Sequence, residues 1–274
     1  MTYSIVARDP ETGELGVAVQ SHYFSTGSIV PWAEPGAGAV ATQSFAEASY
    51  GALGVDLMRT GMAAPAAVRA LVAADEGEAT RQVAMVDATG RVAAHTGASC
   101  IADAGHRTGD GWSVQANMMR RATVWDAMAT AYEAASGDLT DRLLAALDAA
   151  EGEGGDLRGQ QSAALLVVPA SGPPWARVMD LRVEDHPAPL GEMRRLVAMK
   201  RAYASEQHGP AMGDNPELIF WHGVGLAAAG KVEEALPLLE RAYRADDGWA
   251  LLLRRLPAVG LFPDNPELLA KLLP

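Results

Sequence analysis

The sequence predicts an α+β protein built as a four-layer αββα sandwich, in which two antiparallel sheets pack face to face between helical layers. A small all-α appendage is expected to follow at the C-terminal end. Strand-like and helix-like runs come in blocks, in the order strands, two helices, strands, two helices, strands. Tight turns join several of the strands, as in antiparallel hairpins. From Asp214 onward the pattern is wholly helical.

The first block contains three short β-prone runs, at 4–8, 15–20 and 38–44. The turn D-P-E-T-G-E joins the first two runs, and its proline and glycine suit a hairpin. Residues 21–36 are expected to form a loop. The third run, G-A-V-A-T-Q-S, consists of small residues that permit close packing between two sheets.

Apolar residues then recur at helical spacing over 49–60 and 64–74, which predicts the first helix pair. Strands are expected at 82–87 and 91–95, on either side of the turn A-T-G. A further strand is expected at 112–118. This block therefore returns the chain to the sheets.

The second helix pair is predicted at 123–135 and 139–150. Two last strands are expected at 163–168 and 177–183, separated by the helix-breaking and strand-breaking stretch A-S-G-P-P. A doubly wound parallel sheet is the alternative fold. It would require strands and helices to alternate singly, and the blocks do not.

A domain boundary is expected near residue 205, which gives a main domain at 1–205 and a helical appendage at 206–274. Small and apolar residues in the appendage fall at the spacing of a tetratricopeptide-type helical hairpin: Gly223, Gly230, Ala235, Leu239 and Ala242. About three such repeats are needed for an independent solenoid. A single repeat favours an appendage that caps the main domain or contacts a partner.

Composition restricts the partners. The 274 residues carry a formal net charge of −12, and an acidic surface repels both phosphate backbones and acidic membranes. We expect neither nucleic acid nor a membrane as a partner. A single cysteine excludes an intrachain disulfide and fits a reducing, cytoplasmic compartment. The sequence shows neither the pattern of a signal peptide nor a stretch of about 20 apolar residues.

Thr2 follows Met1 directly and opens the first strand-like run. Removal of Met1 would give Thr2 a free α-amine beside its own hydroxyl, which supplies a nucleophile and a base in one residue. An α-amine has an ordinary pKa of about 7.7–8.0, so part of it is neutral near pH 7. The alternative is that Thr2 is only the ordinary start of a strand.

Polar residues at the ends of neighbouring strand-like runs are expected to gather near Thr2. They are Ser21, His22, Gln43 and Ser44, which we predict to bind substrate, and Glu47, which we predict to orient the reacting groups. Arg158 is predicted to bind a substrate carboxylate through its planar fork. The alternative for Arg158 is an ion pair with Asp156 that holds the loop G-G-D-L-R-G.

The segment from His106 to Asn117 is polar and contains glycine, and we expect its first part to be a loop that lines a site. His106 is predicted to orient reacting groups. Asn117 is predicted to donate its amide N–H to an oxyanion, a contact worth about 2.7–4 kcal/mol in the transition state. Alternatively, Gln115 and Asn117 only cap turns through backbone hydrogen bonds.

Cys100 lies six residues before His106, so the two could form a thiolate nucleophile. A lone cysteine more often serves as a small buried apolar residue. His95, Cys100 and His106 match no tight zinc-ligand spacing, and we expect neither a metal nor a cofactor.

Several stretches resemble one known family. They are T-Y-S-I-V-A-R-D-P-E-T-G-E-L-G-V-A-V, P-G-A-G-A-V-A-T-Q-S, H-T-G-A-S-C-I-A-D-A-G-H, Q-A-N-M-M, G-G-D-L-R-G-Q-Q-S-A-A-L-L-V and R-V-E-D-H-P-A-P-L. The chain resembles the bacterial domain-of-unknown-function 1028 family, which is grouped with the N-terminal nucleophile (Ntn) hydrolases. The resemblance implies a four-layer αββα fold with Thr2 in the nucleophile position. The lysines are only Lys200, Lys231 and Lys271, so the chain lacks the lysine that proteasome-like members use beside the threonine.

The expected function is an Ntn-type hydrolase that cleaves a C–N bond, amide or ureido, of a small carboxylate-bearing metabolite, with Thr2 as nucleophile. The alternative is a non-catalytic binding or assembly protein that keeps the fold and docks a partner with its helical tail. A third alternative is a thiol enzyme built on Cys100 and His106. A homo-oligomer, such as a dimer, is expected because related folds commonly pair.

Overall fold

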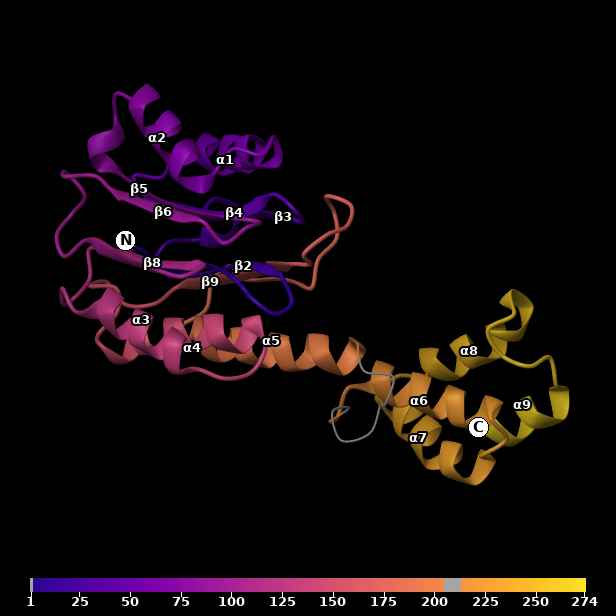
Figure 1. Cartoon of the computed structure of the whole chain (residues 1–274). Coiled ribbons are helices and arrows are strands. Elements are labelled where there is room, and N and C mark those ends of the chain that lie inside the picture. The colour runs from indigo at the N-terminus through magenta and orange to yellow at the C-terminus, as the bar shows by residue number, and fades with distance from the viewer. Residues whose placement is uncertain (1, 205–212) are drawn as a thin grey trace. The chain divides into compact units, whose positions relative to one another are not determined.

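The computed structural model describes residues 2–204 and 213–274. The chain forms two compact units, one ending at Val197 and the other spanning Ala198–Pro274. The first unit is an α+β structure with two antiparallel sheets, as expected (Figure 1). Every strand pair in the described residues is antiparallel, so the doubly wound parallel alternative is wrong.

The larger sheet has six strands in the order β10-β9-β2-β1-β8-β7. Their bounds are β1 Thr2–Arg8, β2 Leu15–Ser21, β7 Gly105–Gly109, β8 Trp112–Asn117, β9 Ser162–Val168 and β10 Met179–Val183. The first strand is central and pairs with β2 on one side and with β8 on the other. Thr2 therefore starts a strand that is held along both of its edges.

The smaller sheet has four strands in the order β3-β4-β5-β6. Their bounds are β3 Pro31–Glu34, β4 Gly38–Ser44, β5 Arg81–Asp87 and β6 Val92–Thr96. The expectation that 21–36 is entirely a loop was wrong, because β3 lies within it. Pro31 opens this strand at the edge of the sheet, the position where a strand tolerates proline.

A second strand falls within the segment expected to be a loop after Gly105. Strand β7 reads G-H-R-T-G and has almost no β-branched or apolar residues, so its composition gives no strand signal. Pairing with β8 decides its conformation instead. The glycines at its two ends lie against aromatic rings, where a Cβ atom on Gly105 would overlap Trp125 and one on Gly109 would overlap Trp112.

Helices cover the outer faces of the two sheets (Figure 1). The helices α1, Ser49–Arg59, and α2, Ala64–Ala74, pack against strands of the smaller sheet. The helices α3, Val124–Ala134, and α4, Leu139–Gly152, pack against the larger sheet. Helix α5, Pro189–Ala204, adds Leu190, Met193 and Val197 to the same core.

The contact between the two sheets is apolar at one end and polar at the other. Its apolar part includes Val6, Leu15 and Val17 from the larger sheet and Ala84 and Val86 from the smaller one. Toward the start of β1 the facing side chains become hydroxyls and amides, which hydrogen bond across the gap. This polar end positions the candidate site.

The second unit is helical. It contains α6 Pro216–Ala228, α7 Val232–Ala245, α8 Gly248–Arg255 and α9 Pro266–Leu272. The first two form a hairpin around Gly230, whose φ of 82° suits glycine. Gly223 lets α7 approach closely, because a Cβ there would lie 2.9 Å from Leu239. Ala235, Leu239 and Ala242 are fully buried.

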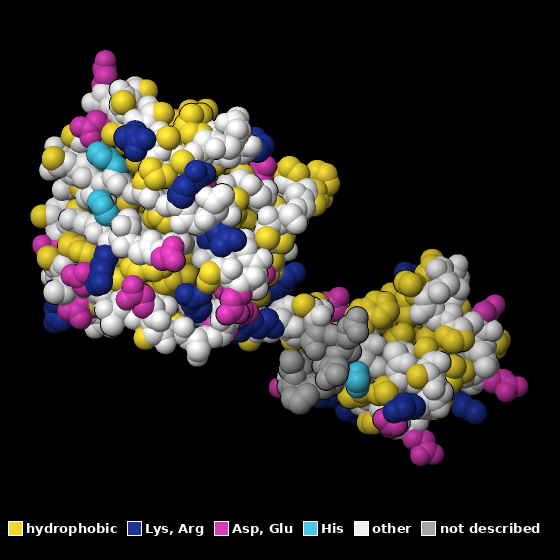
Figure 2. Space-filling model, viewed as in Figure 1, with side chains coloured by type: hydrophobic (Ala, Val, Ile, Leu, Met, Phe, Trp, Pro, Cys, Tyr) yellow, Lys and Arg dark blue, Asp and Glu magenta, His cyan; other side chains and the backbone are white. Residues whose placement is uncertain are grey.

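The face of the larger unit seen in Figure 2 carries arginines interspersed with acidic residues. Among the described residues, no helix combines the length and the apolar character that crossing a membrane requires.

Candidate functional site at the start of the first strand

Thr2 is nearly buried at the beginning of β1. Its hydroxyl Oγ1 lies 3.0 Å from the hydroxyl of Ser21, the last residue of β2. Because β1 and β2 are antiparallel, the start of one strand adjoins the end of the other. On the opposite side Thr2 pairs with Asn117, the last residue of β8.

A cavity of about 180 Å³ opens beside Thr2. Four of the residues predicted from the sequence line it: Thr2, Ser21, Gln43 and Ser44. The rest of its lining comes from Tyr23, Thr26, Ile29, Val30 and Ala46. The cavity thus has a polar end at Thr2 and apolar walls supplied by the segments that follow β2 and β4.

Two buried amides hold the main chain of Thr2. The Nε2 group of Gln43 donates to the Thr2 carbonyl at 3.3 Å, and Nδ2 of Asn117 donates to the same oxygen at 3.4 Å. Both amides also donate to one atom, Oε1 of Gln82, at 2.7 and 2.9 Å. Gln82 therefore fixes the two groups that fix Thr2.

Gln82 is fully buried and anchored in turn by its own amide nitrogen. Its Nε2 donates to Thr96 Oγ1 at 2.9 Å and to the carbonyls of Gly105 and Ala116 at 3.1 and 2.9 Å. It thus links both sheets at the polar end of their contact.

A second chain of hydrogen bonds, from residues of the larger sheet, holds the Gln43 side chain. Ser4 Oγ donates to Gln43 Oε1 at 2.7 Å, and Gln115 Nε2 donates to Ser4 Oγ at 2.6 Å. Gln115 Oε1 accepts from Ser113 Oγ at 2.9 Å. Because buried polar groups are costly when unpaired, these bonds hold the Gln43 amide in one orientation.

Three residues other than glycine have a positive φ in the described part of the chain, and all three lie in segments around Thr2. They are Ser25 at 57°, Ser44 at 70° and Met118 at 58°. Ser44 lines the cavity, Met118 follows Asn117, and Ser25 lies between Tyr23 and Thr26. Such conformations cost about 1–3 kcal/mol and often occur at functional sites.

Tyr3 points away from the cavity, into the core under α4. Its hydroxyl donates to Glu151 Oε2 at 2.8 Å. Burial raises the pKa of Tyr3 well above its usual value, and the negative charge of Glu151 adds to the effect. The phenol therefore stays protonated and anchors β1 directly behind Thr2.

His22 and Arg158 lie in adjoining segments but do not line the cavity. The His22 main-chain N–H donates to Asp156 Oδ2 at 3.0 Å, and the buried ring Nδ1 has no partner in the described structure. Arg158 forms an ion pair with Asp156, with Nη2 and Oδ2 3.2 Å apart. That pair is the loop-holding contact expected as the alternative role of Arg158. The substrate-binding roles of both residues stay predictions.

Glu47 also lies outside the lining of the cavity. Its Oε1 accepts from the Ser49 main-chain N–H at 3.1 Å, and hydrogen bonds from the side chain and the main chain of Ser49 lower the pKa of Glu47. Its carbonyl accepts from Thr42 Oγ1 at 3.0 Å. The structure thus places Glu47 at the start of α1, and its orienting role stays a prediction.

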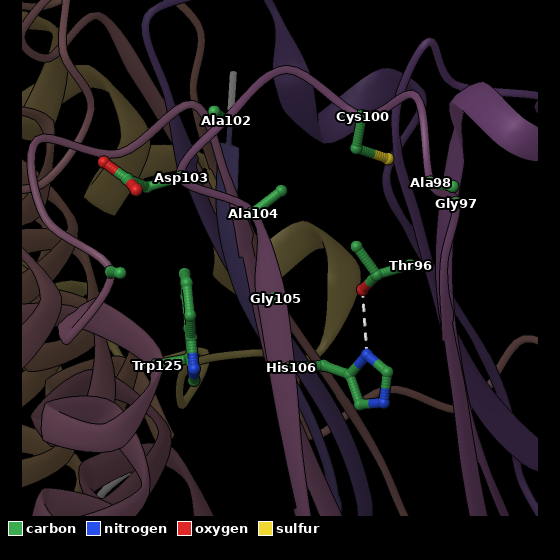
Figure 3. Close-up of a pocket in the computed structure, with 11 residues that line it drawn as sticks. Thr96, Gly97, Ala98, Cys100, Ala102, Asp103, Ala104, Gly105, His106 and Trp125 are labelled. Carbon is green, nitrogen blue, oxygen red and sulfur yellow. Dashed lines mark hydrogen bonds between the residues drawn. The ribbon is translucent and has the colours of Figure 1, made fainter.

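His106 lines a different and larger cavity of about 630 Å³, together with Cys100 and Trp125 (Figure 3). Nδ1 of His106 lies 2.8 Å from Thr96 Oγ1. Burial lowers the pKa of His106, and the neighbouring His95 lowers it further. The hydroxyl of Thr96 also accepts from Gln82, so hydrogen bonds link His106 to Thr2 through Thr96, Gln82 and then Gln43 or Asn117.

Cys100 is not paired with His106 in the way a thiolate nucleophile requires. Its Sγ donates to the Arg81 carbonyl at 3.3 Å, and Figure 3 shows Thr96 between the thiol and the imidazole. Over residues 2–204 and 213–274 no cluster of three histidine, cysteine or acidic side chains could hold a metal.

Two features of the site were missed by sequence reasoning. Gln82 was expected only as a strand residue, although a glutamine that precedes an apolar run, Q-V-A-M-V, is a usable signal. The apolar wall formed by Ile29 and Val30 lies in the stretch expected to be a loop. Removal of Met1, on which the expected chemistry depends, lies outside the described residues.

Comparisons with known proteins agree with this architecture in its larger unit. The model of a family described as "Family of unknown function (DUF1028)" matches residues 2–193. The crystal structure of protein SPO2555 from Silicibacter pomeroyi, assigned to the same family model, is 34% identical, with a TM-score of 0.67. That match covers 75% of this chain and 87% of the other.

A second solved structure, Anbu (ancestral beta-subunit) from Yersinia bercovieri, is 13% identical, with a TM-score of 0.35. It covers 75% of this chain and 97% of its own. No curated protein matches the chain.

Proposed function

The chain belongs to the DUF1028 family, and we propose that this member is an Ntn-type hydrolase that cleaves a C–N bond of a small amide or ureido compound. Thr2 is the nucleophile in this proposal, after removal of Met1. The observation that carries the proposal is the position of Thr2: it starts a central strand, its hydroxyl contacts Ser21, and it lines a cavity.

The proposed reaction uses the hydroxyl and the α-amine of Thr2 as nucleophile and base. The Thr2 hydroxyl attacks the substrate carbonyl carbon, and its proton passes to the α-amine. The tetrahedral intermediate collapses, the C–N bond breaks, and the ammonium returns the proton to the leaving nitrogen. Water then attacks the resulting ester by the same route, which releases the acid and restores Thr2.

The oxyanion needs a donor that faces the cavity. Asn117 gives one N–H to Gln82 and the other to the Thr2 carbonyl, so its expected role would require the longer of these bonds to move. Ala46 lines the cavity, and its main-chain N–H makes no hydrogen bond in the described structure. We assign the oxyanion contact to the N–H of Ala46, with Asn117 holding the Thr2 main chain.

The finer architecture belongs to the same proposal. We infer that the helix pairs and sheets form the four-layer αββα arrangement of Ntn hydrolases. Support comes from α1 and α2 packing on the smaller sheet and α3 and α4 on the larger one. We also infer a tetratricopeptide-like hairpin in the second unit, supported by the close approach of Gly223 to Leu239.

The experiment that tests the function begins with the intact mass of protein made in a cell with normal methionine processing. Loss of Met1 and hydrolysis of small amides by wild-type protein, but not by Thr2→Ala, is the expected result. Retention of Met1 would sink the self-activated threonine and favour the binding or assembly role. Thr2→Ser, which keeps a hydroxyl, is expected to retain measurable activity.

A further inference from the structure

The cavity beside Thr2 is lined by nine residues, none of which has a side chain that is charged at neutral pH. The polar lining is made of hydroxyls and one amide, and the remainder is apolar. The amide of Gln43 is already occupied, because its nitrogen donates to Thr2, Gln82 and Gln115 while its oxygen accepts from Ser4. Among the side chains of the lining, a substrate carboxylate would meet hydroxyls but no free amide donor and no cation.

Two arginines flank the site, and acidic side chains neutralise both. Arg81 donates to the Phe45 carbonyl at 2.7 Å, next to Ala46, and its Nε lies 2.8 Å from Asp75 Oδ2. Arg158 is paired with the buried Asp156. Neither arginine lines the cavity. Neither arginine thus offers an unpaired cation where the acyl part of a substrate would lie.

The size of the cavity limits its occupant. About 180 Å³ is close to the volume of apolar cavities that hold a single benzene molecule, about 150 Å³. Ile29, Val30 and the ring of Tyr23 supply the apolar contact surface. One short aliphatic chain or one small ring therefore fills the space beyond the Thr2 hydroxyl.

We propose that this cavity is the acyl-binding site and that it selects small uncharged acyl groups over carboxylate-bearing ones. The inference rests on the proposed function, because only a hydrolase of this kind would bind an acyl group there. It departs from the carboxylate-bearing substrate expected from the sequence. Its physical basis is desolvation. Moving an ionised carboxylate from water into a mostly apolar site without a charged partner costs far more free energy than the new contacts recover. A carboxylate on the leaving group, outside the cavity, is compatible with it.

Binding of a matched pair of amides tests the selectivity without requiring turnover. Butyramide and succinamate share a four-carbon amide chain and differ in one terminal group, a methyl or a carboxylate. Each is titrated into the full-length protein and followed by the amide resonances of labelled protein. Butyramide is expected to bind and shift resonances of the cavity, while succinamate binds at least about tenfold more weakly.

A variant that introduces a positive charge tests whether the cavity itself makes the selection. Ala46 is exposed at the rim of the cavity, so Ala46→Arg places a cation there without disturbing the core. This variant is expected to tighten succinamate binding about tenfold. Ala52→Arg is the matched control, at an exposed position on α1 outside the lining of the cavity. It should change the affinity for succinamate less than about twofold.

The proposal is overturned if succinamate binds wild-type protein as tightly as butyramide, if neither amide binds, or if both arginine variants act alike. Because the readout is binding, these outcomes are separate from failure of the Thr2 chemistry. If Thr2 is unreactive, the proposed hydrolase activity is contradicted, but the selectivity of the cavity for the two amides can still be measured.

Discussion

The hydroxyls of Thr2 and Ser21 lie 3.0 Å apart at the adjoining ends of two antiparallel strands. Each hydroxyl can donate or accept, so Ser21 can hold the Thr2 side chain in the rotamer that faces the cavity. The contact belongs to the centre of the larger sheet and not to a loop. The pairing of β1 with β2 therefore fixes the position of the proposed nucleophile.

Replacement of Ser21 with alanine is expected to slow acylation of Thr2 about fivefold, because a hydrogen bond worth about 1 kcal/mol no longer orients the hydroxyl. The rate is measured with an activated ester by single-turnover kinetics. Ser171→Ala, at an exposed position between β9 and β10, is the matched control. Equal rates for both variants would show that Ser21 does not position Thr2.

Replacement of Gln82 with leucine is expected to destabilise the protein by about 3 kcal/mol. It removes the acceptor shared by Gln43 and Asn117 and leaves buried donors unpaired. Urea unfolding measures the change. Gln161→Leu removes a more exposed hydrogen bond to Asp185 and should cost no more than about 0.5 kcal/mol. A loss below about 1 kcal/mol for Gln82→Leu would contradict a connecting role for Gln82.

Tyr3 predicts a specific response to alkaline pH. Its pKa is raised by burial and by Glu151, so the folded state keeps the phenolic proton that the unfolded state releases near its ordinary pKa of about 10. The stability from this group is complete below about pH 10 and is lost as the pH rises further. Tyr3→Phe should lower stability at pH 7 by about 1–2 kcal/mol and make the alkaline loss shallower.

The check on Tyr3 is urea unfolding at several pH values between neutral and alkaline. Tyr23→Phe alters an exposed phenol and controls for stability at neutral pH. An alkaline slope that stays the same in Tyr3→Phe would exclude Tyr3 as a contributor.

Ser44 predicts a separation of stability from activity. Its φ of 70° favours glycine, so Ser44→Gly should stabilise the fold by up to about 1 kcal/mol, while Ser44→Val should destabilise it. If the positive φ serves the site, acylation should be no faster in the more stable glycine variant. Thermal unfolding and acylation rates of the two variants measure both effects, and a glycine variant that unfolds more easily would refute the strain.

The sequence was sufficient for the α+β class, because hairpin turns and apolar periodicity are local signals. It failed at β3 and β7, where pairing with a neighbour overrides weak propensity. Strand-end reasoning also brought Thr2, Ser21, Gln43 and Ser44 together, since antiparallel strands share their ends. The position of each residue within its strand was enough for that step.

What the sequence could not supply was the direction of individual side chains. Glu47 and His106 have suitable chemistry and lie close to site residues along the chain, yet they bond elsewhere. Gln82 was not singled out because its importance comes from two partners on different strands, β4 and β8. Such long-range pairs depend on the packing of the two sheets, which no local pattern encodes.

The most direct test of the central claim is the site of acylation after exposure to p-nitrophenyl butyrate. Intact mass and peptide mapping should find Met1 absent and one butyryl group on Thr2, removable by hydroxylamine because it is an ester. The adduct should be missing in Thr2→Ala and retained in Cys100→Ser. Retained Met1, or a butyryl group on Cys100 with Thr2 unmodified, would contradict the account.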